Sequence, residues 1–347
     1  MFVVVIAMAS CGCASRPRPP VTTGAPQSTL RSIALPGAPP DGAVAMDYIA
    51  YDGERHRLWV PAGNTGNVDV VDEGSGKVLP IGGFPTSEME RRGTKRIVGP
   101  SSATIGEGTV YVGNRGDSRV CAVDAVTLHV GACVRLDSMP DGLLYVPSLK
   151  ELWVTTPRDQ SIVVLDASSA GALAIRQRVA FDGEPEGFAL DDARGIFYTN
   201  LEDKNRTLAI DVKTRAVVQT WLPGCGEDGP KGLAIDRQWR FLMVACSDGV
   251  VVLDAGHGGV QLAKLGTGDG VDNIDYLPSR HELYVAAARA ARLTTARLDA
   301  RGTLTVLGDV PTAPGVRNAV ATEAGLIYLT DARRGSILVV GSSSREP

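Results

Sequence analysis

The stretch Arg57-Leu58-Trp59-Val60 holds the first copy of a short apolar pattern that recurs along the chain. Six copies have an aromatic residue at the centre, and a seventh, Phe241-Leu242-Met243, has leucine there. The aromatic copies are Leu58-Trp59-Val60, Val110-Tyr111-Val112, Leu152-Trp153-Val154, Ile196-Phe197-Tyr198, Leu283-Tyr284-Val285 and Ile327-Tyr328-Leu329. With Leu242 included, the seven centres are 52, 42, 44, 45, 42 and 44 residues apart. A period of about 40–50 residues indicates one supersecondary unit repeated along the chain.

Each repeat contains four short β-rich runs. In the fifth repeat these runs are 232–236, 241–245, 250–254 and 260–265. Gly, Asp or Asn residues separate them, as expected for the turns of an antiparallel meander. Seven such units predict an all-β fold, a seven-bladed β-propeller with four-stranded antiparallel blades.

The third run of six repeats ends on an aspartate. These residues are Asp72, Asp124, Asp166, Asp211, Asp254 and Asp299. An aspartate at this position can accept hydrogen bonds from backbone N–H groups of the following turn. We therefore expect each of them to begin the hairpin that leads to the outer strand.

The seventh repeat, residues 318–340, has only three runs. The segment 30–36 resembles the ends of other repeats, such as residues 220–223. We expect it to pair with residues 336–340 and to close the ring, because an open ring would leave two exposed sheet edges. The propeller is predicted over residues 29–341, and residues 342–347 are predicted to form a disordered tail.

The N-terminal segment predicts export. Residues 2–9 are apolar but too few to span a membrane, and they match the apolar part of a secretory signal. Met8-Ala9-Ser10-Cys11 resembles a bacterial lipobox, so we predict a signal peptide over residues 1–13 with Cys11 lipidated and Cys13 as a second candidate. A plain cleaved signal or a misassigned start codon is the alternative. Residues 14–28 are rich in proline and are predicted to be a tether, with the protein in the periplasm or at the cell surface.

Four more cysteines lie within the repeats. Cys225 and Cys246 fall on the same face of adjacent blades, and export makes a disulfide between them chemically reasonable. Cys121 and Cys133 lie on consecutive strands of one hairpin and can pair across it. The alternative for both pairs is buried free thiols. The chain has no Cys-x-x-Cys or histidine-rich spacing that would indicate a metal site.

The charge of the chain gives no case for nucleic-acid binding. Its 347 residues carry a formal net charge of −4. The densest basic run consists of Arg91, Arg92, Lys95 and Arg96, beside Glu88 and Glu90. It lies in the longest connection, residues 84–100, and is interpreted as a solvated loop.

Charged residues begin the innermost strand of most blades, where they would surround one mouth of the central channel. The ring consists of Asp47, Ser101, Asp141, Glu186, Lys231, Asp272 and Arg317, followed in two blades by Asn273 and Asn318. Clustered carboxylates repel, so they need neighbouring cations, a bound metal or raised pKa values. The functional interpretation is a site for a small polar ligand or a divalent cation such as Ca²⁺. The structural alternative is a solvated channel whose charges neutralise one another.

The same face should carry the loops between second and third strands, which are candidate recognition elements. These loops are residues 64–66, 114–117, 156–159, 200–205, 288–292 and 331–334. All four histidines are instead expected on the opposite face; they are His56, His129, His257 and His281. A zinc hydrolase or a Ser-His catalytic pair needs imidazole at its site, so neither is supported. Phosphate-binding and nucleophile-elbow motifs are absent, as are helix signals.

The repeats resemble the YVTN-repeat group of bacterial seven-bladed propellers, within the broader lactonase- and gluconolactonase-like propeller superfamily. The segments that carry this resemblance are 47–52, 57–60, 187–191, 198–204, 222–225 and 231–234. The resemblance covers about residues 30–340 and implies an exported, non-catalytic protein that binds a small polar ligand or an envelope protein on one face. Membrane contact is then expected only through the N-terminal lipid.

The same resemblance implies an alternative, a metal-dependent lactonase. Gluconolactonase-like propellers hold a divalent cation at the channel mouth with Glu, Asn and Asp side chains. The corresponding residues of this chain are Asp47, Asp141, Glu186, and Asp272 or Asn273. Ser101 and Lys231 depart from that pattern, which weakens the implied metal site.

Overall fold

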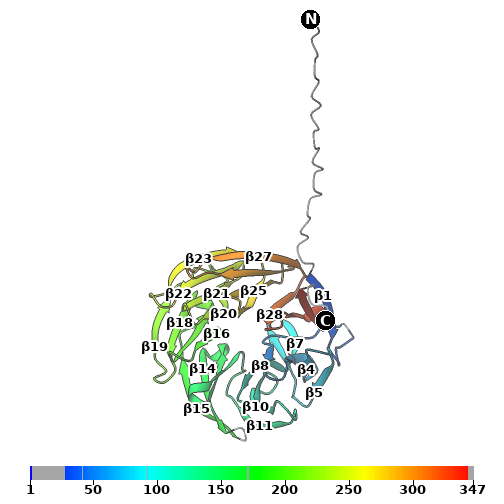
Figure 1. Cartoon of the computed structure of the whole chain (residues 1–347). Coiled ribbons are helices and arrows are strands. Elements are labelled where there is room, and N and C mark those ends of the chain that lie inside the picture. The colour runs from blue at the N-terminus through cyan, green and yellow to red at the C-terminus, as the bar shows by residue number, and fades with distance from the viewer. Residues whose placement is uncertain (2–27, 41, 92, 170–171, 343–347) are drawn as a thin grey trace.

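The computed structural model describes Met1 and residues 28–40, 42–91, 93–169 and 172–342 of the chain. They form seven four-stranded antiparallel sheets around a common axis (Figure 1), together with one two-stranded hairpin. This arrangement confirms the predicted all-β, seven-bladed propeller. Residues 2–13 of the predicted signal peptide, with Cys11 and Cys13, lie outside the described residues, as do residues 14–27 of the predicted tether and 343–347 of the predicted tail. Ser28 and Ser342 pair with each other, so the propeller extends one residue beyond each predicted limit.

The strands of each blade follow one another from the axis outward, and the last blade takes its outer strand from the N-terminal segment. Blades one to three are β2 (Ala50–Asp52), β3 (Arg57–Ala62), β4 (Asn67–Asp72) and β5 (Val78–Ile81); β8 (Pro100–Gly106), β9 (Thr109–Asn114), β10 (Arg119–Asp124) and β11 (Val130–Arg135); β12 (Leu143–Val146), β13 (Glu151–Thr156), β14 (Ser161–Ser169) and β15 (Ala172–Ala180). Blades four and five are β16 (Pro185–Asp191), β17 (Ile196–Leu201), β18 (Arg206–Asp211) and β19 (Val217–Trp221); β20 (Pro230–Asp236), β21 (Phe241–Cys246), β22 (Gly249–Asp254) and β23 (Val260–Gly266). Blades six and seven are β24 (Val271–Leu277), β25 (Glu282–Ala287), β26 (Arg292–Leu298) and β27 (Leu304–Pro311); β28 (Val316–Ala321), β29 (Ile327–Asp331), β30 (Ser336–Ser342) and β1 (Ser28–Ala34).

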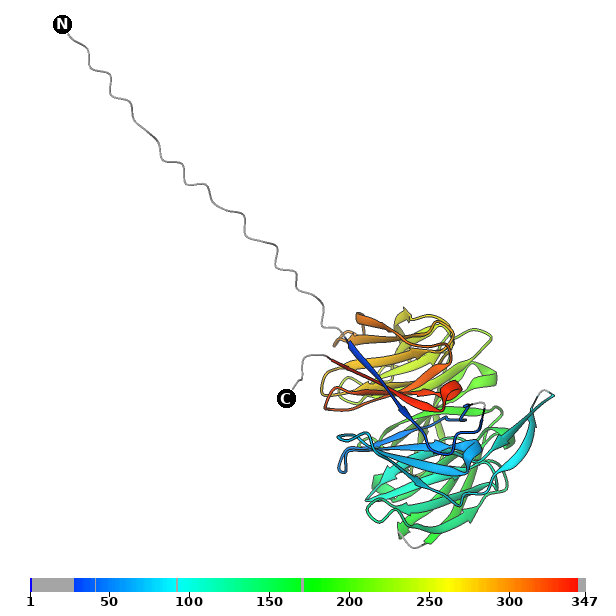
Figure 2. The same ribbon diagram turned by 90° about the vertical axis from the view of Figure 1, so that its right-hand side faces the viewer.

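Strand β1 closes the ring as predicted. It pairs antiparallel with β30, with Leu30 opposite Val340 and Ala34 opposite Ser336. Figures 1 and 2 show these two strands, blue and red, lying side by side at the edge of the disc. The strand begins and ends two residues earlier than the predicted segment 30–36. Closure leaves no blade with an unpaired third strand.

The apolar core lies in the seams between neighbouring blades. The described residues form seven apolar clusters, each drawn from two adjacent blades. The central residue of every repeated triplet is buried in one of these seams, and Trp59, Trp153 and Tyr328 are fully inaccessible. Trp153 of blade three stacks on Phe197 of blade four, with ring centroids 4.7 Å apart. The pattern that predicts the repeat is therefore also the one that joins the blades.

The aspartates at the ends of the third strands cap the turns that follow them. Asp124 accepts hydrogen bonds from the backbone N–H groups of Val126 and Thr127 at 2.9 and 2.6 Å. Equivalent bonds from backbone N–H groups reach Asp72, Asp166, Asp211, Asp254 and Asp299. The predicted turn role is confirmed. Asp166 differs in one respect, because β14 continues three residues beyond it.

Both predicted disulfides are present. Cys225, in the loop leaving blade four, is bonded to Cys246 at the end of β21 in blade five. Cys121 and Cys133 lie directly opposite each other on β10 and β11 and are bonded within blade two. One disulfide therefore links two blades, and the other links the two outer strands of a single blade.

Two features differ from the sequence-based expectation. The long connection 84–100 is not a plain loop, because β6 (Ser87–Arg91) and β7 (Thr94–Val98) form a hairpin that projects from the disc in Figure 2. Five single-turn 3₁₀ helices also occur in the described chain: η1 (Gly63–Thr65), η2 (Pro147–Leu149), η3 (Pro157–Asp159), η4 (Glu202–Lys204) and η5 (Ala332–Arg334). Four of them, all but η2, occupy loops between second and third strands, where short turns need only three residues. None of the helices in the described segments has the length and apolar character required to cross a membrane.

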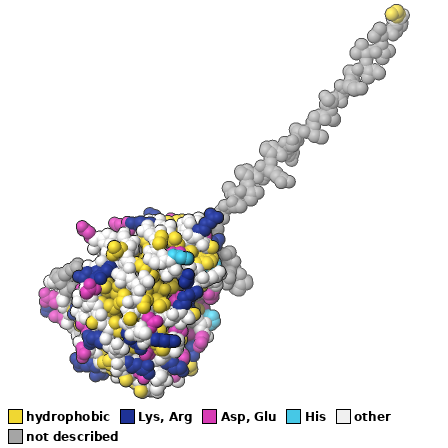
Figure 3. Space-filling view, turned by 90° about the vertical axis from the view of Figure 1, so that its left-hand side faces the viewer, with side chains coloured by type: hydrophobic (Ala, Val, Ile, Leu, Met, Phe, Trp, Pro, Cys, Tyr) yellow, Lys and Arg dark blue, Asp and Glu magenta, His cyan; other side chains and the backbone are white. Residues whose placement is uncertain are grey.

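The outer wall of the disc exposes apolar side chains. Figure 3 shows them gathered on the side of the molecule where blades four and five lie in Figure 1. Val217 and Val218 on β19 and Val260 on β23 are among the exposed large apolar residues.

Candidate functional site

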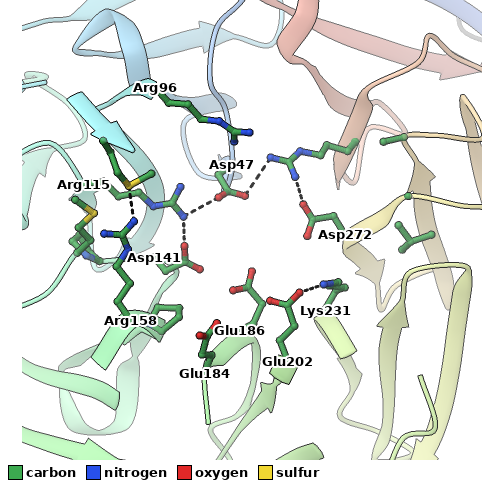
Figure 4. A pocket seen from close by; sticks show the side chains of 18 of the residues that line it. Asp47, Arg96, Arg115, Asp141, Arg158, Glu184, Glu186, Glu202, Lys231 and Asp272 are labelled. Atoms are coloured by element: carbon green, nitrogen blue, oxygen red, sulfur yellow. Dashed lines mark hydrogen bonds and ion pairs between the residues drawn. The ribbon is translucent and has the colours of Figure 1, made fainter. Parts of the chain in front are cut away.

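The structure brings the predicted ring residues to one end of the central channel. Six of them line a single cavity of about 640 Å³, shown in Figure 4: Asp47, Asp141, Glu186, Lys231, Asp272 and Arg317. Ser101 lines an adjoining cavity of about 1030 Å³ on the side of the β6–β7 hairpin. Asn273 and Asn318 line a smaller cavity of about 190 Å³ further along the channel. The predicted convergence is therefore present, while the binding roles of these residues stay a prediction.

β-Bulges aim the ring side chains at the axis. The pairing between first and second strands shifts register at the ring residue or directly after it in five blades, between Pro100 and Ser102, Glu186 and Phe188, Pro230 and Leu233, Val271 and Ile274, and Arg317 and Val320. A bulge leaves its extra residue outside the ladder and redirects its side chain. Two bulges use left-handed backbone, with φ of 57° at Gly187 and 58° at Asn318. Glycine and asparagine tolerate that conformation best.

Threonines on the second strands hold the distorted backbone at the ring. The Thr199 hydroxyl donates a hydrogen bond of 2.9 Å to the carbonyl of Gly187. The Thr330 hydroxyl donates one of 3.0 Å to the carbonyl of Arg317. These bonds satisfy carbonyl groups that the bulges remove from the regular ladder, so the ring is fixed by its neighbouring strands.

Ion pairs neutralise most of the ring carboxylates. Arg115, from the loop between β9 and β10, bridges Asp47, at 3.0 Å, and Asp141 (Figure 4). Arg317 pairs with Asp272, and Lys231 pairs with Glu202 of η4. The repulsion expected among the clustered carboxylates is thus relieved largely by cations of the protein itself.

Glu186 differs from the other ring carboxylates. It makes no ion pair with any residue that the structure describes. Its partner is the Tyr48 hydroxyl, which lies 3.2 Å from Glu186 Oε1 and 3.4 Å from Asp141 Oδ2. Burial, followed by the charges of Asp141 and Asp47, raises the pKa of Glu186 well above its ordinary value. The charged form of this carboxyl group is therefore disfavoured until a cationic group binds beside it.

Burial also shifts the other ionisable groups at the mouth. It raises the pKa of Asp141, although the Arg115 charge acts in the opposite direction. It likewise raises the pKa of Asp272 against the Arg317 charge. Burial lowers the pKa of Arg115, but the charges of Asp141 and Asp47 outweigh this effect and raise it overall. Arg115 consequently stays charged between its two carboxylates.

Tyr48 lies between two cavities of the channel. Its hydroxyl contacts Asp141 and Glu186 at the mouth, while its ring stacks on Phe188 with centroids 5.4 Å apart. Tyr48 and Phe188 both line the smaller cavity of about 190 Å³. Burial and the nearby carboxylates raise the pKa of Tyr48 well above its ordinary value, so its hydroxyl remains a hydrogen-bond donor.

The residues do not form a ready-made metal site. Across the described segments, no three His, Cys, Asp or Glu side chains are placed to hold a metal ion together. Asp47, Asp141 and Asp272 point their carboxylates at arginines instead. Hard cations such as Ca²⁺ require several converging oxygen ligands. The predicted cation therefore stays a prediction that this arrangement does not favour.

Several residues of the site were not among the predicted ring. Tyr48, Arg115 and Glu202 make its central contacts, and Arg96 and Arg158 line the cavity from β7 and η3. Arg96 belongs to the basic run that is interpreted as solvated, and its side chain is exposed, but it lies on the strand β7 and also lines the mouth (Figure 4). Lys95 of the same run does form an exposed pair with Glu88, at 2.7 Å. The excess of carboxylates over bases in the predicted ring was the signal that a further cation, Arg115, was needed.

The histidines lie on the opposite face, as predicted. His56 and His281 occupy turns between first and second strands, and His129 and His257 occupy turns between third and fourth strands. The His281 ring stacks on Trp239, with centroids 4.2 Å apart, and its Nδ1 lies 3.2 Å from Asp236. These contacts join neighbouring turns and do not involve the mouth.

Comparison with known proteins identifies the fold more clearly than the activity. No family model matches the chain. It is 28% identical over 185 residues to a 6-phosphogluconolactonase of Serratia proteamaculans, an alignment that spans 50% of this chain and 52% of that enzyme. The chain thus matches about half the length of this curated relative.

Solved structures share the architecture at low sequence identity. Virginiamycin B lyase from Staphylococcus aureus superposes with a TM-score of 0.70 at 12% identity, covering 91% of this chain and 99% of the lyase. A chain of a mitotic checkpoint complex superposes with a TM-score of 0.74 at 14% identity, covering 97% of this chain and 98% of that one. A chain of Kuenenia stuttgartiensis hydrazine synthase superposes with a TM-score of 0.71 at 13% identity, covering 88% of this chain and 97% of that one. Proteins named for unrelated roles therefore share this fold, which does not select a function by itself. The chain is a seven-bladed β-propeller of the kind found in the virginiamycin B lyase structure.

Proposed function

We propose that this protein binds a small polar ligand in the cavity at the channel mouth and does not alter it chemically. The observation that carries the proposal is the convergence of charged side chains from every blade on one cavity of about 640 Å³. This volume lies within the range of about 300–1,000 Å³ that is typical of small-molecule sites. Bulges and threonine hydrogen bonds fix the lining side chains before any ligand arrives.

Two further features favour binding over catalysis. None of the four histidines lies at the mouth, so the commonest general base is missing there. Most of the charged groups are also engaged in ion pairs that position them, as in a preorganised binding site. An envelope protein that docks on the same face is the other form of this proposal, and the convergence of the charged side chains on one cavity favours the small ligand.

A thermal-shift screen of small polar compounds tests the proposal. At least one compound should raise the Tm of the wild-type protein, and a Glu186→Gln or Arg317→Gln variant should lose that rise. Glu88→Gln, on the exposed β6–β7 hairpin and outside the cavity, serves as the matched control. A screen without any stabilising compound, or a rise that survives both mouth substitutions, would contradict a ligand site at the mouth.

Lactone hydrolysis is a second candidate function, and the similarity to 6-phosphogluconolactonase supports it. Glu186 is then the residue suited to take a proton from the attacking water, because it is the ring carboxylate that no described cation pairs with and because Tyr48 fixes it at the mouth. We expect lactone hydrolysis that falls at least tenfold in Glu186→Gln if this function is correct. Calorimetric titration with Ca²⁺ tests the accompanying cation, and hydrolysis unaffected by Glu186→Gln would exclude this role for the residue.

We also propose that the protein is an exported lipoprotein of the YVTN-repeat kind, anchored through Cys11. The two disulfides support an oxidising compartment. Metabolic labelling with a radioactive fatty acid should mark the wild-type chain and the Cys13→Ser variant but not Cys11→Ser. Labelling that is lost in Cys13→Ser instead would place the lipid on Cys13. A wild-type chain without any label would contradict the lipid anchor.

A further inference from the structure

The charges that line the mouth are segregated across the cavity. Arg96, Arg115 and Arg158 come from the connections of blades one to three and lie on one side in Figure 4. Glu184, Glu186 and Glu202 come from blade four and lie together on another side. The cavity therefore has a basic wall and an acidic wall.

Part of each wall remains without a counter-charge. Arg115 and Glu202 are engaged by Asp141 and Lys231. Within the described chain, no ion pair is formed by Arg96 or Arg158 on the basic wall, nor by Glu184 or Glu186 on the acidic wall. The Arg158 guanidinium donates a hydrogen bond to the Met89 sulfur, at 2.6 Å. Arg289, from the loop after β25, is a further lining arginine without an ion pair among these residues.

Glu186 is the deepest of these groups and is held in place. The Tyr48 hydroxyl donates to it at 3.2 Å, and Tyr48 in turn stacks on Phe188. Its neighbour Gly187 adopts left-handed backbone within the bulge, which aims the Glu186 side chain at the axis. A carboxylate fixed among other carboxylates is a strong site for a cationic group, because a cation there removes the repulsion.

A ligand of a single charge fits this cavity poorly. An anion that pairs with Arg96 and Arg158 gains nothing at Glu184 and Glu186, and its charge is repelled there. A cation that pairs with Glu186 meets the opposite problem at the arginines. Only a molecule with separated charges of both signs is complementary to both walls.

Building on the proposed function, we propose that the ligand is a zwitterion. Its cationic amine lies at Glu186 and Glu184, and its carboxylate or phosphate lies at Arg96 and Arg158. The arginine guanidinium groups suit planar or tetrahedral oxyanions because they donate several hydrogen bonds in a fixed geometry. The ion pairs of Arg115, Arg317 and Lys231 hold the rest of the lining neutral around it.

Calorimetric titration with a matched series of probes tests this inference. The probes are unbranched ω-amino acids of four to eight carbons, together with dicarboxylates and diamines of the same lengths. At least one amino acid should bind tenfold or more tightly than both of its single-sign counterparts. Glu186→Gln and Arg158→Gln should each weaken that binding at least tenfold, whereas the control substitutions Glu88→Gln and Arg119→Gln should leave it unchanged.

The outcomes separate this inference from the proposed function. Dicarboxylates or diamines that bind as tightly as the amino acids, and lose affinity in the mouth variants, would overturn the zwitterion while leaving a ligand site at the mouth. Amino-acid binding that survives both mouth substitutions would overturn the two-wall geometry. Absence of binding across the whole series would also overturn the zwitterion, and the broader thermal-shift screen decides separately whether the mouth binds anything.

Discussion

The two faces of the disc are built from the same seven blades, yet only one of them repeats its residues. On the face with the histidines, six blades place an aspartate at the same position, and each caps its turn with the same kind of backbone hydrogen bond. At the mouth, the equivalent ring positions hold Asp, Ser, Asp, Glu, Lys, Asp and Arg in turn. A residue type that recurs at the same position from repeat to repeat stabilises the fold. Equivalent positions whose residue types differ between blades are available to form a binding site.

The difference also separates two kinds of electrostatics. The turn aspartates are partly or fully exposed, and hydrogen bonds from their own turns lower the pKa values of Asp72, Asp124 and Asp211. The mouth carboxylates lie together around the channel, and burial raises the pKa values of Glu186, Asp141 and Asp272. The same chemical group thus stabilises one face through local bonds and creates on the other face a need for counter-charges.

Both faces depend on the closed ring, so loss of β1 should have the largest effect. A chain that lacks residues 28–36 would expose the edge of β30 and the apolar seam between blades seven and one. We expect aggregation and the loss of a cooperative thermal transition, measured by size-exclusion chromatography and calorimetry. A chain that begins at Ser28 is the control. A truncated protein that stays monomeric with an unchanged Tm would contradict closure by β1.

Arg115→Gln should strongly affect the mouth while leaving the opposite face intact. It leaves Asp47 and Asp141 without their shared cation, and we expect a loss of about 3 kcal/mol in the free energy of unfolding. The pKa of Asp141 is already raised and should rise further. The folded state then favours the protonated group, so the loss should be small at pH 5 and grow as the pH rises to 8. Urea denaturation measures this, with Arg119→Gln as the exposed control, and equal losses at both pH values would contradict the explanation.

Asp69→Asn tests whether burial of a carboxylate is tolerated away from the mouth. Asp69 lies in the middle of β4, fully buried, and neither of its oxygens has a hydrogen-bond partner among the described residues. Burial raises its pKa to about 7, against about 3.9 in an unfolded chain, so its contribution to stability is present at acid pH and is lost as the pH rises towards 7. The amide should therefore stabilise the protein by about 1–2 kcal/mol at pH 8 and by little at pH 4. Asp72→Asn, at the end of the same strand, should not stabilise, and a pH-independent gain for Asp69→Asn would refute this account.

The smallest effect should come from the repeated face. Asp211→Ala removes the hydrogen bonds to Lys213 and Thr214 from an exposed turn, and we expect the Tm to fall by at most about 2 °C. Asp124→Ala in another blade should lower the Tm by a similar amount, because its turn has the same bonds. Calorimetry compares the two variants, and clearly unequal shifts would show that the repeated positions are not equivalent.

The sequence allowed the fold to be predicted because the features that build it are periodic. The aromatic centre of each triplet fills a seam, and the aspartate that ends a third strand caps a turn, so both appear at every repeat. Ring closure was predictable for the same reason, since only the last repeat lacks an outer strand. Periodicity also predicted that the ring residues lie at the mouth, because each stands at the start of the first strand of its blade.

The individual contacts of the remaining residues could not be predicted because they lie off the repeat. Arg115, Arg158 and Glu202 belong to loops that the sequence does predict as recognition elements, but no repeated position indicates which side chain of each loop lines the cavity, and Arg96 comes from the hairpin in the connection 84–100. Tyr48 follows Asp47 directly, but its position under Glu186 depends on how blades one and four face each other across the axis. Side chains that meet through the centre of a ring leave no spacing signal in the chain.

The pairing of β1 with β30 also sets an order for biosynthesis. The Thr29 hydroxyl bonds to the carbonyl of Gly341 across 312 residues of chain, so a ribosome must release almost the whole polypeptide before the last blade can assemble. The disulfides, by contrast, join cysteines only 12 and 21 residues apart and can form while later blades are still being made. These local disulfides can therefore form before the two ends of the chain pair. Until the ends pair, the apolar residues between blades seven and one stay exposed.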